Sequence, residues 1–123
     1  MGDPRRVVLV TNHPDTAELY AFGLERAEFA VTPVTSTREA VRICRAAPPD
    51  AVIVHFAPAE NPAEVGATLR QSNPEMILIG LFSMRLPMTT LQQVLKTFDD
   101  VILIPCPPDA LVARLQRLLK KKK

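Results

Sequence analysis

The stretch Pro49-Asp50-Ala51-Val52-Ile53-Val54-His55-Phe56-Ala57-Pro58 decides the fold of this 123-residue chain. Its apolar run from Ala51 to Val54 does not alternate with polar residues, which is typical of a strand buried on both faces of a parallel sheet. His55 follows directly, at the carboxyl end of the predicted strand. Open α/β sheets carry their functional groups at that end, so His55 is the first candidate site residue.

Similar apolar runs recur along the chain and alternate with helical patterns. We predict strands over residues 6–10, 29–34, 51–54, 76–81 and 101–104, each followed by a helix. This order favours one doubly wound α/β domain, a parallel sheet with helices on both faces in a three-layer sandwich. Pro33 lies inside the second strand, and because proline cannot donate a ladder hydrogen bond, that strand is expected at an edge. The predicted strand order is therefore 2-1-3-4-5.

Three local patterns make the helix predictions specific. The first helix begins at Pro14 and places Leu19, Phe22, Gly23 and Leu24 on its inner side. Ser36-Thr37-Arg38-Glu39 has the form of a capping box and starts the second helix. The fourth helix is expected over residues 88–98, with an inner side formed by Leu91, Val94, Leu95 and Phe98.

The charge is concentrated at the end of the chain. Lys120 to Lys123 account for the net charge of +2, and acidic residues outnumber basic ones in residues 1–119. We expect a domain over 1–119 and a basic tail or linker start over 120–123. Because residues 1–119 carry no excess of positive charge, specific nucleic-acid binding is not expected.

The remaining composition argues for an intracellular domain. Cys44 and Cys106 are isolated and match neither a disulfide framework nor a zinc-binding spacing. No segment approaches the about 18 apolar residues of a membrane helix, and Met1 to Arg6 is no signal peptide. We expect a cytoplasmic protein with no membrane contact.

The predicted topology brings a set of side chains to the crevice above the carboxyl ends of the strands. They are Thr11, Asn12, His13, His55, Phe56, Phe82, Ser83 and Ile104. None is a carboxylate, so a magnesium site is not expected. No glycine-rich turn follows the first strand, so a cradled nucleotide is not expected either, and we predict no cofactor.

Four segments carry a family resemblance: Val7–Val10 with the turn Asn12–Asp15, Pro49–Val54, Ile79–Leu81, and Asp99–Pro105. With their order and spacing, they make residues 5–119 similar to the receiver domain of two-component response regulators. The resemblance implies the flavodoxin- or CheY-like fold and a role in signal transduction or a phosphorelay. It also implies a cis bond before Pro105.

The chain departs from the family at the positions that carry its chemistry. Thr11 and Asn12 replace the acidic pair that holds magnesium, and His55 replaces the phosphorylated aspartate. Phe82 replaces the hydroxyl residue, with Ser83 one place later, and Ile104 replaces the lysine. Phosphoryl transfer depends on positioning and charge neutralisation, which these residues do not supply. We therefore interpret the chain as a pseudo-receiver without enzymatic activity, whose crevice is closed by Phe82.

His55 itself has more than one interpretation. It is expected as a neutral histidine that hydrogen-bonds Asn12 or Thr11; the alternatives are a titrating switch and a phosphohistidine. As a second function, His13 and His55 form part of a ligand or metal sensor, in which Cys106 completes a three-ligand zinc site.

The outer face is the remaining candidate site. In the family, the fourth helix, fifth strand and fifth helix form the usual dimer and output face. The corresponding residues here are Gln92, Gln93, Lys96, Asp99, Asp100 and Arg114. Met84, Leu86 and Met88 are expected to pack under the fourth helix, or otherwise to form a soft partner surface. The expected partners are other signalling proteins, an attached output domain or a second copy of the chain.

Overall fold

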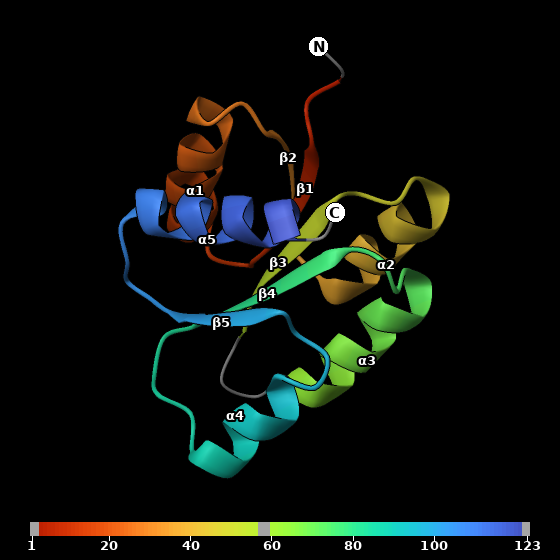
Figure 1. Cartoon of the computed structure of the whole chain (residues 1–123), viewed down its shortest axis with the longest axis vertical. Helices are drawn as coiled ribbons and strands as arrows, with labels where there is room; N and C mark the ends of the chain where they lie inside the picture. The colour runs from red at the N-terminus through yellow and green to blue at the C-terminus, as the bar shows by residue number, and fades with distance from the viewer. Residues whose placement is uncertain (1–2, 57–59, 122–123) are drawn as a thin grey trace.

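Five parallel strands alternate with five helices in the computed structural model, which describes residues 3–56 and 60–121 (Figure 1). The predicted loop residues Ala57 and Pro58 and the last two lysines lie outside the described residues. The strands are β1 (Arg6–Val10), β2 (Ala30–Val34), β3 (Ala51–His55), β4 (Ile77–Phe82) and β5 (Asp100–Leu103). The helices are α1 (Pro14–Arg26), α2 (Thr37–Ala46), α3 (Pro62–Ser72), α4 (Met88–Val94) and α5 (Pro108–Lys121).

The sheet has the order β2-β1-β3-β4-β5, which confirms the predicted topology. Pro33 lies opposite Leu9 in the edge strand β2. The N–H of Ala30 donates to the Arg5 carbonyl on the β1 side, so the backbone nitrogens of Val31 and Pro33 face the free edge. Proline is tolerated there because no ladder hydrogen bond is lost.

The helices form one layer on each face of the sheet (Figure 1). In that view, α1 and α5 cover one face, and α2, α3 and α4 cover the other. Alternate residues of the strands supply the two cores: Leu9 and Ile53 face α1 and α5, whereas Val8 and Val52 face the other layer. Every residue of β4 is buried, as its continuous apolar run predicts.

Half of the predicted capping box forms at the start of α2. Ser36 Oγ accepts the N–H of Glu39 at 3.2 Å, which satisfies one of the free amides of the first turn. The Glu39 carboxylate binds the backbone N–H and hydroxyl of Thr35, each at 3.2 Å, instead of the amide of Ser36.

The structure corrects the prediction for α4. This helix ends at Val94, not at residue 98, because the N–H groups of Thr97 and Phe98 both bond to the Val94 carbonyl and turn the chain. Leu95, predicted to face inward, is 47% exposed, whereas Phe98 is buried as predicted.

The inner side of α1 is also different from the predicted one. Leu19 and Phe22 are exposed, whereas Gly23 and Leu24 are buried as predicted, and Tyr20 is buried with them. A Cβ at Gly23 would collide with Pro108, so this part of α1 lies directly against the start of α5.

The predicted boundary after residue 119 falls inside a helix. Lys120 and Lys121 belong to α5, at the end where positive charge interacts favourably with the helix dipole. No helix among residues 3–56 and 60–121 is long and apolar enough to cross a membrane.

Gly66 in α3 generates a first prediction. A Cβ there would collide with the Thr97 hydroxyl and lie 2.7 Å from the Phe98 ring. Alanine normally favours a helix over glycine by about 1 kcal/mol. We nevertheless expect Gly66→Ala to lower the free energy of unfolding by about 1–3 kcal/mol, because overpacking dominates. Urea denaturation measures the change.

Thr68→Ala is the matched control, since it places alanine at an exposed position of the same helix. It should leave the free energy of unfolding unchanged or raise it by a few tenths of a kcal/mol. A stabilised Gly66→Ala variant would contradict the close α3 packing.

Candidate functional site

A chain of hydrogen bonds joins the ends of β1, β3 and β4. Thr11 Oγ1 and His55 Nδ1 lie 3.0 Å apart, and His55 Nε2 and Ser83 Oγ lie 3.2 Å apart. Parallel pairing in register aligns the carboxyl ends of these strands, which brings together residues 28 and 44 positions apart in the sequence. The predicted gathering of these side chains is confirmed.

Thr11 is the buried member of this chain. Its Oγ1 also accepts the N–H of His13 at 3.1 Å, and its own N–H donates to the Val34 carbonyl. One side chain therefore fixes both the turn after β1 and the ring of His55. Of the two predicted partners for His55, Thr11 is the one that binds it, whereas Asn12 is exposed.

His55 is held in its neutral form by its surroundings. Burial lowers its pKa below the ordinary value of 6.5, because removing water disfavours the charged ring. The neighbouring His13, whose ring centroid is 5.1 Å from that of His55, lowers the pKa further, and Glu60 acts in the opposite direction. This environment matches the prediction of a neutral histidine.

Phe82 is part of the core. Its ring stacks on Phe56 with centroids 4.8 Å apart, and Phe56 meets Phe98 edge-on at 5.5 Å. Gly80 makes room for them, since a Cβ there would lie 3.0 Å from the Phe82 ring and 3.2 Å from Phe56. The glycine inside an otherwise apolar strand was the sequence signal for this close approach, and our sequence analysis missed the cluster.

Ile104 is buried in the opposite core, which contains α1 and α5. Its N–H donates to the Phe82 carbonyl at 2.8 Å, so the end of β5 remains tied to β4. The Ile104–Pro105 bond is cis, as predicted.

The crevice is not closed, contrary to our expectation that Phe82 would fill it. Although Phe82 packs in the core, a cavity of about 450 Å³ remains between the end of β3, the start of α3 and the β4–α4 loop. Its lining includes both histidines; the full set is His13, His55, Phe56, Glu60, Pro62, Phe82, Ser83, Met84, Leu86 and Thr90. A second cavity of about 350 Å³ lies beside it and shares His13, His55 and Ser83.

The predicted three-ligand zinc site does not form. Cys106 Sγ lies 3.7 Å from the Tyr20 hydroxyl, which also donates to the Cys106 carbonyl at 2.8 Å. Across the described ranges, no three His, Cys, Asp or Glu side chains are grouped closely enough to hold a metal ion.

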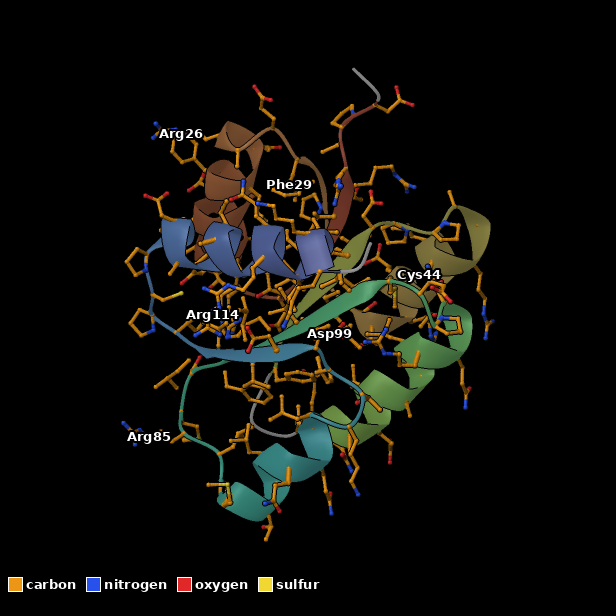
Figure 2. All side chains as sticks on the ribbon, viewed as in Figure 1. Arg26, Phe29, Cys44, Arg85, Asp99 and Arg114 are labelled. Atoms are coloured by element: carbon orange, nitrogen blue, oxygen red, sulfur yellow. The ribbon has the colours of Figure 1, made fainter. Side chains whose placement is uncertain are left out.

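The charged residues proposed for the outer face lie in two places. Asp100 pairs with Arg114 of α5 at 2.6 Å. Asp99 instead binds Arg70 of α3 at 2.7 Å and accepts the N–H of Leu78 at 2.8 Å, so it stabilises the fold. Figure 2 labels Asp99 at the start of β5 and Arg114 of α5.

Apolar side chains are exposed around α4. Met84 and Met88 are each 67% exposed, so the prediction that they pack under α4 is wrong, whereas Leu86 is half-buried against the core. They line a groove of about 460 Å³ between the β4–α4 loop, α4 and β5, together with Leu91, Leu95 and Leu103. Gln92, Gln93 and Lys96 are exposed on the same helix and the turn that follows it.

The lowered pKa of His55 generates a second prediction. In the unfolded chain, His55 takes up a proton as pH falls through the ordinary pKa of 6.5. In the folded chain, its pKa is lower, so it takes up the proton only at a lower pH. The free energy of unfolding should therefore decrease as pH falls from 7 to 5, because the unfolded state binds more protons. Chemical denaturation at a series of pH values measures this slope.

His55→Asn should flatten that slope, and an unchanged slope would contradict the assignment to His55. His13→Gln should raise the pKa of His55 in an NMR titration, because the neighbouring charge is removed.

Comparison with known proteins gives a fold but no sequence family. No protein-family model and no curated protein sequence matches this chain. Solved structures do match: a CheY-like response regulator receiver domain protein from Methanospirillum hungatei JF-1 has a TM-score of 0.87 and 15% identity, covering 97% of this chain and 96% of that one. The chemotaxis response regulator CheY4 of Vibrio cholerae has a TM-score of 0.81 and 19% identity, with 93% and 98% covered. The BeF3-activated DrrB receiver domain has a TM-score of 0.80 and 17% identity, with 95% and 98% covered. This chain has the fold of response regulator receiver domains.

Proposed function

We propose that the chain is a receiver-like signalling module that acts by protein–protein contact, without phosphorylation and without enzymatic activity. The observation that carries the proposal is the hydrogen-bonded series Thr11–His55–Ser83, which occupies the position of the phosphorylated aspartate and its magnesium ligands with uncharged groups. The receiver fold supports the signalling role.

The neighbouring positions support the same conclusion. An incoming phosphoryl group needs cations and aligned donors to neutralise the developing charge. Here Ile104 supplies an aliphatic side chain, and Phe82 supplies a ring that is packed against Phe56. Both His55 nitrogens have hydrogen-bond partners, so attack on a phosphoryl group would first require one of these bonds to break.

The groove between α4 and β5 is the proposed contact surface. Isolated exposed apolar residues are common, but Met84, Met88, Leu95 and Leu103 gather around one hollow. Methionine side chains adapt to differently shaped partners. Gln92, Gln93, Lys96 and the Asp100–Arg114 pair supply polar groups nearby. Candidate partners are another signalling protein, an attached output domain or a second copy of the chain.

A phosphoryl mimic tests whether the module acts without phosphorylation. We expect no saturable change in amide NMR shifts at residues 11–13, 55 and 82–83 when magnesium and beryllofluoride are added. The DrrB receiver domain, solved in a BeF3-activated form, is the positive control.

Saturable shifts at these positions, comparable to those of the control, would overturn the phosphorylation-independent function. Magnesium and beryllofluoride should be added separately as well, so that binding of either component alone is recognised.

Self-association tests the contact surface. We expect sedimentation equilibrium to show a concentration-dependent dimer, and the double variant Leu95→Gln/Leu103→Gln to weaken it by at least about tenfold. Fully burying one leucine contributes about 1.5–3 kcal/mol, and tenfold corresponds to about 1.4 kcal/mol.

Leu19→Gln is the matched control: Leu19 is 46% exposed, close to the 47% of Leu95 and Leu103, but lies on α1. It should leave the association unchanged. A dimer weakened equally by both sets of variants would contradict the location of the surface.

A further inference from the structure

The cavity beside His55, here called the His55 cavity, has the properties of a small-molecule site. Its volume of about 450 Å³ lies within the range of known ligand pockets, roughly 300–1,000 Å³. It opens at the carboxyl edge of the sheet, where the chain leaves β3 and β4. Open α/β sheets bind ligands at this edge.

The walls of the His55 cavity are mainly apolar. Phe56 and Phe82 contribute aromatic carbon, and Met84 and Leu86 contribute flexible aliphatic groups from the β4–α4 loop. Methionine sulfur makes favourable contacts with aromatic rings. These walls favour a flat, apolar body over a polar or strongly hydrated one.

The polar groups of the His55 cavity are few and lie together. His55 and Ser83 both line it, and the Nε2–Oγ distance of 3.2 Å is at the long end for a hydrogen bond. A neutral imidazole offers one donor and one acceptor, and a serine hydroxyl offers both. A ligand hydroxyl can therefore insert between them and replace the hydrogen bond that it breaks.

Ring position and charge narrow the ligand class further. Thr11 fixes the other nitrogen of His55, so the ring keeps its orientation toward Ser83. Burial lowers the pKa of His55, which favours its uncharged form, and no lysine or arginine is among the described residues that line the cavity. A carboxylate or phosphate ligand would therefore lose water there without a cationic side chain to pair with among these residues, which disfavours anions.

We propose that the His55 cavity binds a small, uncharged aromatic molecule that carries a hydroxyl group, with its ring against Phe82 and Met84 and its hydroxyl at His55 and Ser83. Such a site would give the module a chemical input in place of phosphorylation. It goes beyond the proposed contact function. Phe82, Met84 and Leu86 also line the groove between α4 and β5, so the probes should be titrated at protein concentrations at which the chain is monomeric.

The test uses three small probes and the full chain labelled with ¹⁵N. 4-Ethylphenol has the proposed chemistry, 4-ethylanisole lacks the hydroxyl donor, and 4-ethylbenzoate carries a negative charge. We expect saturable amide shifts with 4-ethylphenol, confined to residues 55–56, 82–86 and 90 and the turn at His13. The other two probes should bind at least fivefold more weakly.

Two variants link binding to the cavity. The double variant His55→Leu/Ser83→Ala removes both hydrogen-bond partners of the ligand hydroxyl, so it should weaken 4-ethylphenol about fivefold and should change 4-ethylanisole less. Thr68→Ala removes a hydroxyl from the exposed side of α3 and should not alter either affinity. Unchanged shifts outside the cavity confirm that each variant is folded.

Three results with 4-ethylphenol would overturn the proposal. They are shifts that do not saturate, equal affinities for 4-ethylphenol and 4-ethylanisole, and an affinity for 4-ethylphenol that His55→Leu/Ser83→Ala does not change. Saturable binding of 4-ethylbenzoate alone would likewise show that the cavity prefers anions.

Discussion

Burial of β3 and β4 on both faces is the constraint on which the rest of this structure depends. Strands such as Ala51–His55 and Ile77–Phe82 expose apolar side chains in both directions, so helices must cover both sides of the sheet. Right-handed crossovers then run all strands the same way and bring their carboxyl ends to one edge. The position of His55 beside Thr11 and Ser83 follows from this arrangement.

At that edge, a series of uncharged side chains is joined by hydrogen bonds. Charged side chains in the same place would require a counterion. Thr11, His55 and Ser83 satisfy one another, so this part of the crevice is stable without a bound metal. Below it, the Phe56, Phe82 and Phe98 rings pack around Gly80. The uncharged series and the aromatic cluster are therefore adjacent parts of one site.

The sequence predicted features that depend on local chemistry or on the strand pattern. Pro33 indicated the edge strand, the apolar runs indicated the strand order, and the cis bond before Pro105 followed from the family resemblance. Features that depend on contacts between distant elements were not predictable. Close packing of Gly23 on Pro108 decides which side of α1 is buried, and the turn after Val94 exposes Leu95.

The same limit applies to the candidate site. Which residues meet at the sheet edge was predictable, because parallel register aligns the strand ends. Whether a cavity remains there depends on the direction of the Phe82 ring. The ring direction depends in turn on the space beside Gly80 and on the position of Phe98, which lies eighteen positions after Gly80 in the sequence. Likewise, Asp99 and Asp100 are adjacent in sequence but bind arginines of different helices, Arg70 and Arg114.

Pro33 also affects how copies of this protein can meet. Of the five residues of β2, only Val31 and Pro33 direct their backbone nitrogens to the free edge, and proline carries no hydrogen there. An approaching strand would find a single amide donor along that edge, too few for a continuous ladder. The protein is thereby protected at β2 from the edge-to-edge growth of sheets that leads to fibrils.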